Sequence, residues 1–281
     1  MNNFALYLNV TANNMEPTLK YLQTLSAKEN VNIYLFSEQS EFKEWFPVMQ
    51  NGAKIDCILV MGGDGTILRA VKYSLKYKAP LLGINLGHLG FLSESSLEEL
   101  EKAIIDLKNN KYKILSRMML KAMLKRADTE TKSHLALNDV VISKGESPKL
   151  INLKVYSNRR YVFSTRCDGM IAASPTGSTA YALSAGGPII SPVMDAIVVV
   201  PITPHVLTVR PMVFPSSDNI TFDIKGEHEN CCLQVDGCNF EHIQDGDRIT
   251  ITAAPQKVDF IKLSNRTFYK VLRKKMHLGK K

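Results

Sequence analysis

The chain has 281 residues, of which 45% are hydrophobic, and this length is sufficient for the cores of two domains of ordinary size. No apolar run approaches the ~20 residues that span a bilayer, and the N-terminus lacks the pattern of a signal peptide, so we expect a cytoplasmic protein with no membrane partner. The net charge of +8 suits anionic partners such as small phosphorylated ligands, but most basic residues are scattered and no aromatic stacking motif accompanies them, so we expect no nucleic-acid partner.

Residues 1–110 alternate apolar, strand-like runs with helical patterns. Strands are expected at residues 4–10, 31–36, 55–60 and 80–85, and helices at 17–28, 66–77 and 96–109. Such alternation predicts an α/β domain in which helices cover both faces of a parallel sheet. The domain is expected to be Rossmann-like without the Gly-x-Gly-x-x-Gly fingerprint, because Leu68 stands where the third glycine would be.

A Gly-Gly-Asp-Gly motif at residues 62–65 directly follows the apolar run at 58–60. Glycines at a strand end let the main chain approach a ligand, and the following helix directs unpaired N–H groups at an anion, so the motif predicts a phosphate site. Phosphates repel the carboxylate of Asp64, so this interpretation also implies Mg²⁺ or another divalent cation. An ordinary Asp-Gly turn is the alternative. A P-loop is excluded, because no glycine-rich turn ends in Gly-Lys-Ser or Gly-Lys-Thr.

A second glycine-rich turn is expected at residues 87–92, after the strand at 80–85. Ligands of parallel sheets bind at the carboxyl ends of the strands, so the two turns are expected to line one crevice. Ser96, followed three residues later by Glu99, forms a capping-box pattern that predicts the start of the next helix.

After residue 111 short β-type runs dominate, and they predict an all-β domain at residues 111–260, followed by a tail at 261–281. The runs lie at residues 121–124, 140–143, 153–155, 161–164, 197–200, 220–224, 232–235 and 248–252. The five cysteines show no Cys-x-x-Cys spacing, which favours buried, reduced thiols over a zinc site or disulfides.

One segment, residues 166–188, departs from this β pattern and is dense in small hydroxyls and glycines. Hydroxyl groups both donate and accept hydrogen bonds, and glycines let the main chain wrap a ligand. The segment therefore predicts a binding surface for an extended ligand with ribose hydroxyls and phosphates, with a short helix at 179–185. A helix cap with a tight turn is the alternative, but it explains only two or three of these residues.

Several motifs, taken in chain order over nearly the whole chain, resemble those of the NAD kinases. They are Gly-Gly-Asp-Gly at 62–65, Leu-Asn-Asp at 137–139, Asp-Gly at 168–169, Ser-Pro-Thr-Gly-Ser-Thr-Ala-Tyr at 174–181, Ser-Ala-Gly-Gly-Pro at 184–188, Pro-His at 204–205, Arg-Pro at 210–211 and Phe-Tyr-Lys-Val-Leu-Arg-Lys-Lys at 268–275. The resemblance implies a homodimer or homotetramer of a two-domain enzyme that transfers the γ-phosphoryl group of ATP to the 2′-hydroxyl of the adenosine ribose of NAD. It also implies that the tail packs back on the N-terminal domain.

The resemblance assigns Asp64 as the proton acceptor, the one catalytic residue. Asp139 stands where many members carry glutamate, which shortens the reach of the carboxylate but keeps its charge. No role is assigned to residues 236–239 or to a metal ligand. The phosphate-binding and NAD-binding residues implied by position are Gly62, Gly63, Gly65, Arg69, Asn138, Asp139, Lys149, Arg166, Asp168, Thr179, Ala180, Tyr181 and Ser184.

Arg166 bears on the choice of acceptor, because in the family a charged residue two positions before the second aspartate goes with preference for NAD over NADH. The resemblance implies ATP as the donor, and because some relatives also use polyphosphate, the sequence leaves the donor range open. Two alternatives are a lipid or sugar kinase with the same Gly-Gly-Asp-Gly turn, which leaves residues 166–188 unexplained, and a dinucleotide-binding sensor without activity, against which the retained Asp64 argues. A nucleic-acid-binding role ranks behind both.

Overall fold

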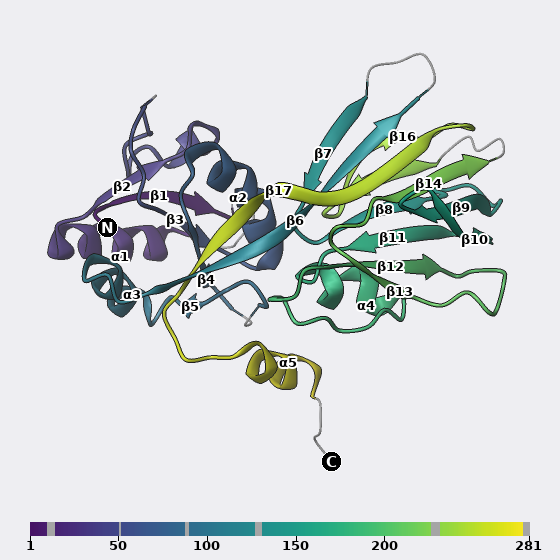
Figure 1. Ribbon diagram of the computed structural model, residues 1–281. Coiled ribbons are helices and arrows are strands. Elements are labelled where there is room, and N and C mark those ends of the chain that lie inside the picture. The colour runs from purple at the N-terminus through teal and green to yellow at the C-terminus, as the bar shows by residue number, and fades with distance from the viewer. Residues whose placement is uncertain (10–14, 51, 88–89, 127–130, 226–230, 278–281) are drawn as a thin grey trace. The chain divides into compact units, whose positions relative to one another are not determined.

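The computed structural model describes residues 1–9, 15–50, 52–87, 90–126, 131–225 and 231–277 (Figure 1). The chain forms two compact units. Unit 1 comprises Met1–Ser116 together with Val258–Lys281, and unit 2 comprises Arg117–Lys257. The end of the chain thus returns to the unit in which the chain begins. None of the helices in the described part of the chain has both the length and the hydrophobicity that crossing a bilayer requires.

Unit 1 is an α/β domain, as the alternating pattern predicts. Its parallel strands pair in the order β2-β1-β3-β4, and β5 and the end of β17 also pair with β4. The strand bounds are β1 Asn3–Leu8, β2 Asn32–Leu35, β3 Cys57–Met61, β4 Leu81–Asn85 and β5 Ser95–Ser96. The helices are α1 Glu16–Glu29, η1 Ser37–Phe42, α2 Asp64–Tyr77, α3 Leu100–Lys108 and α5 Phe268–Met276.

Helices cover both faces of the unit 1 sheet. Leu22 of α1 and Ile104 of α3 lie in one buried cluster with alternate side chains of β1, including Leu6. The intervening side chains of β1 face α2, where the rings of Tyr7 and Tyr73 lie 5.4 Å apart. Strand side chains alternate between faces, so a sheet covered on both sides has the continuous apolar strands found here.

Two helix starts differ from the sequence predictions. α2 begins at Asp64, two residues early, with Gly63 at its N-cap. α3 begins at Leu100, four residues after the predicted Ser96. The capping-box contact from the backbone N–H of Ser96 to Glu99 Oε2 is present at 3.2 Å, but the intervening residues form a turn outside the helix.

Unit 2 is built from β-strands arranged in two layers, as predicted for an all-β domain. One layer follows the order β10-β9-β14-β17, with β6 pairing with β17 and β7, and the other is antiparallel in the order β13-β12-β11-β8-β15-β16. The strand bounds are β6 Lys113–Lys125, β7 Lys132–Ala136, β8 Asp139–Ser143, β9 Ile151–Ser157, β10 Arg160–Cys167, β11 Gly169–Ala173, β12 Ala196–Ile202, β13 Met212–Pro215, β14 Ile220–Lys225, β15 Cys232–Val235, β16 Cys238–His242 and β17 Arg248–Lys262.

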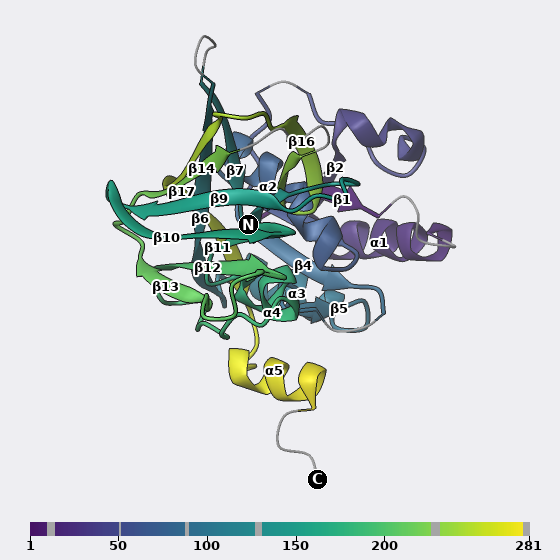
Figure 2. The same cartoon turned by 90° about the vertical axis from the view of Figure 1, so that its right-hand side faces the viewer.

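Each layer of unit 2 contributes one face to a shared core, which holds Val155, Phe222 and Ile249 from one sheet and Val140 and Ile197 from the other. The opposite face of the six-stranded sheet packs against the segment after β11. That segment forms the short helices η2 Gly177–Thr179 and α4 Tyr181–Ser184. Figure 2 shows α4 beside β11 and β12. The predicted single helix at 179–185 is therefore broken, because Ala180 has the non-helical angles φ −97° and ψ −135°.

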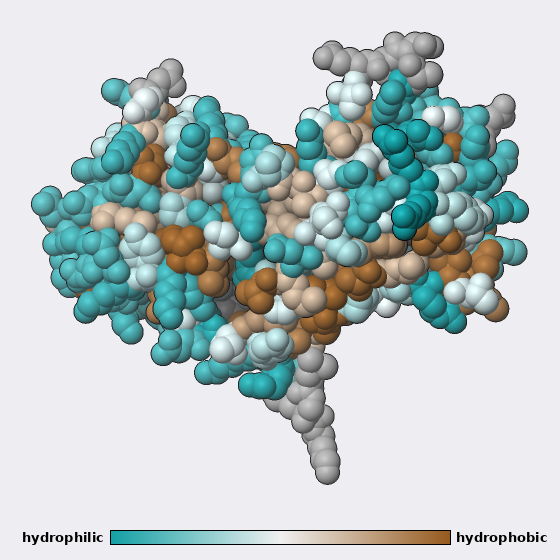
Figure 3. Space-filling view, viewed as in Figure 1, coloured by the Kyte–Doolittle hydropathy of each residue, from teal (hydrophilic) through white to brown (hydrophobic). Residues whose placement is uncertain are grey.

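Apolar side chains are exposed around β13, at the edge of the six-stranded sheet. Val193, Leu207 and Val213 are 80%, 82% and 47% exposed, respectively. Figure 3 shows hydrophobic surface in the region of unit 2 where Figure 1 places β12 and β13. The five cysteines carry no disulfide, and Cys57, Cys167 and Cys231 are buried.

Candidate functional site

The Gly-Gly-Asp-Gly motif joins β3 to α2, so Asp64 lies at the carboxyl end of a central parallel strand and at the first turn of a helix. Gly62 has φ +153°, and a Cβ there would lie 2.5 Å from Thr66 Oγ1, so a side chain does not fit. A Cβ at Gly63 would meet nothing within 4 Å, and at Gly65 only Arg69 Nη1 at 4.0 Å. Glycine at positions 63 and 65 therefore leaves open space beside the backbone, as an approaching ligand requires.

The Asp64 carboxylate is held by the second glycine-rich turn. Its Oδ2 accepts the backbone N–H of Phe91 at 2.8 Å, and its Oδ1 accepts that of Leu92 at 3.1 Å. A Cβ at Gly90 would lie 1.9 Å from Oδ1, so this approach depends on glycine. The two turns contact each other through residues 90–92, as lining one crevice requires, and residues 88 and 89 lie outside the described part.

One cation lies near this carboxylate, and another lies further along the same helix as Asp64. Lys275 of α5 places Nζ 3.8 Å from Asp64 Oδ2, and Arg69, one turn along α2, donates to Thr66 Oγ1 at 3.4 Å. The first N–H groups of a helix have no partner within it and carry partial positive charge, which attracts anions. A fixed carboxylate beside helix N–H groups and an ammonium can orient a hydroxyl group and bind phosphate oxygens. The sequence assigns Lys275 no role of its own, because it shows only that this residue belongs to the tail motif.

In unit 2, Asp236 holds the Leu-Asn-Asp motif at residues 137–139. Its carboxylate accepts the backbone N–H groups of Leu137 at 2.8 Å, Asn138 at 2.7 Å and Asp139 at 3.1 Å. Burial raises the pKa of Asp139 to about 7, and the nearby charge of Asp236 adds to this. Burial also raises the pKa of Asp236, although the three N–H bonds oppose the change. The sequence assigns Asp236 no role, and its only local signal is the Asp-Gly turn at residues 236–237.

Asp168 pairs with a residue that sequence analysis did not single out. Lys144 Nζ lies 2.7 Å from Asp168 Oδ1 and holds the pKa of that carboxyl below its usual range. Arg166 and Lys149 were expected to lie near a ligand, and both side chains are exposed. Within the described residues, neither the Arg166 nor the Lys149 side chain contacts Asp168. The structure therefore does not bring these three predicted site residues into direct contact.

The hydroxyl-rich segment after β11 divides into buried and accessible residues. Ser174 Oγ donates to the carbonyl of Leu137 at 2.5 Å, and Ser178 Oγ donates to the carbonyl of Pro175 at 2.8 Å; both serines are fully buried. These two hydroxyls satisfy backbone groups, as the alternative of a cap with a tight turn predicts for two or three residues of the segment. The predicted binding residues of the segment are at least partly exposed: Thr179, Ala180, Tyr181 and Ser184.

The same segment packs closely on Asn138. The backbone N–H of Ser174 donates to the carbonyl oxygen of Asn138 at 2.8 Å, and a Cβ at Gly177 would lie 2.0 Å from that oxygen. The structure therefore brings the 137–139 motif and the 174–179 loop together within unit 2, although they are far apart in sequence.

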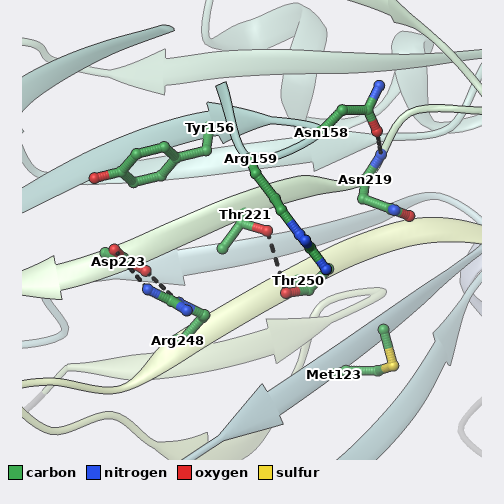
Figure 4. A pocket seen from close by; sticks show the side chains of 9 residues that line it. All are labelled: Met123, Tyr156, Asn158, Arg159, Asn219, Thr221, Asp223, Arg248 and Thr250. Atoms are coloured by element: carbon green, nitrogen blue, oxygen red, sulfur yellow. Dashed lines mark hydrogen bonds and ion pairs between the residues drawn. The ribbon is translucent and has the colours of Figure 1, made fainter. Parts of the chain in front are cut away.

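A groove of about 790 Å³ lies on the other side of unit 2 (Figure 4). It is lined by Tyr156, Thr221 and Thr250, whose strand neighbours Val155, Phe222 and Ile249 point into the core. The groove thus lies on the outer face of the β9-β14-β17 layer. Its polar groups largely bond to one another, and Figure 4 shows the Asp223–Arg248 and Thr221–Thr250 pairs. None of the predicted site residues lines it.

Asp139 predicts a dependence of stability on pH. Its folded pKa of about 7 exceeds the ~3.9 of an unfolded chain, so between these values the folded state keeps a proton that the unfolded state has lost. Stability from this group is therefore lost as pH rises towards 7. Asp139→Asn, which resembles the neutral form, should gain about 2 kcal/mol relative to the wild type between pH 5 and pH 8. Urea denaturation at pH 5 and pH 8 measures the free energy of unfolding of both proteins, with Asp195→Asn, at an exposed site, as the control. The same difference between variant and wild type at both pH values would contradict the prediction.

The chain matches family models for known enzymes along most of its length. The ATP-NAD kinase N-terminal domain matches residues 6–112, and the ATP-NAD kinase C-terminal domain matches residues 137–263. An NAD kinase of Carboxydothermus hydrogenoformans is 42% identical over 87% of this chain and 88% of that protein. An NAD kinase of Desulforamulus reducens is 36% identical over 98% of this chain and 97% of that protein.

Solved structures that are similar to this one include those of two related kinases. Yeast NADH kinase complexed with NADH has a TM-score of 0.90 at 26% identity, covering 100% of this chain and 89% of that chain. An NAD kinase from Archaeoglobus fulgidus in complex with ATP has a TM-score of 0.74 at 26% identity, covering 99% of each chain.

Proposed function

Because the chain belongs to the ATP-NAD kinase family, we propose that it transfers the γ-phosphoryl group of ATP to the 2′-hydroxyl of the adenosine ribose of NAD, giving NADP. The observation that carries this proposal is the Asp64 carboxylate, held by two backbone N–H groups at the start of α2. The comparisons give no support to a lipid or sugar kinase or to a silent sensor.

Asp64 is proposed to orient the acceptor hydroxyl and to take its proton. Phosphoryl transfer passes through a loose transition state, so positioning and electrostatics contribute more than strong base chemistry. A carboxylate is a weak base toward a sugar hydroxyl, so the proton moves late. The N–H groups of Phe91 and Leu92 fix the carboxylate in one orientation, which limits its reorganisation during the reaction.

The NAD-binding residues are proposed from their positions in unit 2. Asn138 and Asp139 sit in a segment fixed by Asp236, and the Thr179–Ser184 stretch is accessible beside it. Carboxylates and amides bind ribose hydroxyls and adenine edges, and exposed loop backbone binds phosphates. This arrangement supports the proposed contacts with NAD.

Mg²⁺ is proposed to accompany ATP. Mg²⁺ sites in phosphotransferases use one or two carboxylates plus substrate phosphates, whereas a protein-only site needs more ligands. The described residues offer no group of three His, Cys, Asp or Glu side chains that could hold a metal, while Asp64 offers one carboxylate beside the open backbone of Gly63 and Gly65. The residues present thus fit a metal held mainly by phosphate oxygens, where it would neutralise charge on the transferred group.

The test is NADP formation by the purified protein, crossed over donors and acceptors. ATP with NAD and Mg²⁺ should give NADP, and omission of Mg²⁺ should abolish it. Polyphosphate as donor decides whether the donor range extends beyond ATP. NAD binding by calorimetry without NADP formation would contradict the proposal and favour a sensor, and phosphorylation of a lipid acceptor in place of NAD would favour the other kinase class.

Arg166 is proposed to favour NAD over NADH. The basis is the resemblance, because Arg166 stands two positions before Asp168, where a charged residue goes with preference for NAD. The wild type should show a kcat/KM for NAD at least about 10-fold above that for NADH, which corresponds to about 1.4 kcal/mol of discrimination. Arg166→Gly should reduce this ratio, whereas Arg160→Gly, on the same strand, should not. Comparable kcat/KM values in the wild type would refute the assignment.

A homodimer or homotetramer remains a prediction. The exposed apolar side chains around β13, including Val193, Leu207 and Val213, would be covered in such an assembly.

A further inference from the structure

One face of the C-terminal helix α5 contacts the residue that holds Asp64. Phe268 and Lys275 are seven residues apart, so they lie on the same side of the helix. The ring of Phe268 lies 6.4 Å from the ring of Phe91, and Lys275 Nζ lies 4.6 Å from the centroid of the same ring. Phe91 thus contacts α5 through its ring while its backbone N–H binds Asp64 Oδ2.

The Lys275 ammonium is held near Asp64, but its N–H groups lack hydrogen-bond partners among the described residues. At 3.8 Å from Asp64 Oδ2 it is attracted to the carboxylate without forming a hydrogen bond. Within the described residues it donates no hydrogen bond, although an ammonium has three N–H donors. Its side chain is 34% exposed, so these donors are accessible from solvent. The cation–π contact with Phe91 limits where the flexible lysine side chain can go.

A cation beside Asp64 can neutralise the negative charge of a bound triphosphate. Asp64 carries a negative charge where a triphosphate must approach, and the charge on the transferred group must be neutralised in the transition state. A lysine ammonium supplies a point charge suited to phosphate oxygens, with hydrogen bonds about twice as strong as neutral ones.

We propose that Lys275 binds the γ-phosphoryl oxygens of ATP beside Asp64, with the ring of Phe91 holding its ammonium in position. The proposal rests on the proposed kinase function and adds a phosphate-binding residue from the C-terminal helix. The neighbouring Lys274 provides a matched control, because it is in the same helical turn with the same charge but makes no contact with Asp64 or Phe91 among the described residues.

The experiment compares Lys275→Gln, Lys275→Arg and Lys274→Gln in the full-length protein. Lys275→Gln should lower kcat/KM for ATP by about 10- to 100-fold, the loss expected for one charge-assisted hydrogen bond, with little change in the KM for NAD. Lys275→Arg should restore part of the activity, because it keeps the charge. Lys274→Gln should resemble the wild type.

Calorimetry separates a γ-phosphoryl contact from a general structural effect. Lys275→Gln should weaken binding of Mg-ATP about 10-fold and leave binding of ADP unchanged, because ADP lacks the γ-phosphoryl group. Equal weakening of both nucleotides, unchanged kcat/KM for ATP, or the same loss in Lys274→Gln would overturn the proposal. Absence of NADP formation by the wild type would instead count against the proposed function.

Discussion

Asp64→Asn is expected to reduce turnover by at least ~10²-fold, the usual size of a general-base contribution, while NAD still binds. The amide removes the proton acceptor. It also has only one oxygen, whereas the aspartate uses both to accept the N–H groups of Phe91 and Leu92. One of these N–H groups then faces an NH₂ group, so the orientation of the side chain is lost with its charge. Steady-state kinetics and NAD calorimetry measure the two effects.

Asp56→Asn is the matched control for this variant. Asp56 also accepts two backbone N–H groups in unit 1, from Asn2 at 2.8 Å and Asn3 at 3.0 Å. Both groups donate to one oxygen, Oδ2, which the amide oxygen of asparagine can replace. The change therefore removes only the charge from these bonds, and it should lower the melting temperature without a comparable loss of turnover. Near-normal turnover in Asp64→Asn would exclude Asp64 as the proton acceptor, and a similar loss in Asp56→Asn would attribute the effect to stability alone.

Gly177→Ala is expected to destabilise unit 2 by about 3 kcal/mol and to weaken NAD binding strongly. The added Cβ would lie 2.0 Å from the carbonyl oxygen and 2.7 Å from the Cα of Asn138. Both atoms belong to backbone, so no side chain can move aside to relieve the clash. The 174–179 loop or the 137–139 motif must then shift, and both carry proposed NAD contacts.

The control is the same change at Gly63, where a Cβ would meet nothing within 4 Å. Urea denaturation should show a large loss of stability for Gly177→Ala and a small one for Gly63→Ala. NAD calorimetry under conditions where Gly177→Ala remains folded measures the second effect. Wild-type stability together with wild-type NAD affinity would show that the packing of the loop on Asn138 is not required.

Local patterns were sufficient to predict the elements nearest to Asp64. The apolar run before the Gly-Gly-Asp-Gly motif and the helical spacing after it predict the β3-to-α2 junction, because each depends on residues a few positions apart. The start of α3 was less predictable. Ser96 and Glu99 make part of the capping-box contact even though the helix begins at Leu100, so this local pattern did not specify the first helical residue.

Burial separates hydroxyl groups that the sequence presents as equivalent. Ser178 and Ser184 are the same residue type in the segment after β11, yet Ser178 is fully buried and bonded to backbone groups, whereas Ser184 is exposed. Which hydroxyl faces solvent depends on the packing of the loop against the sheet, and composition carries no information about it.

By itself, the sequence determined the α/β and β-rich character of the two parts, the position of Asp64 at a strand-to-helix junction and the family to which the chain belongs. These follow from periodicity and from motifs of contiguous residues. Only the tertiary structure decided which residues orient the proposed site: the N–H groups of Phe91 and Leu92 on Asp64, Asp236 under residues 137–139, and Lys275 beside Asp64. The physical reason is that these contacts join residues far apart in the chain, and hydrogen bonds and ion pairs of that kind depend on distances that no local pattern encodes.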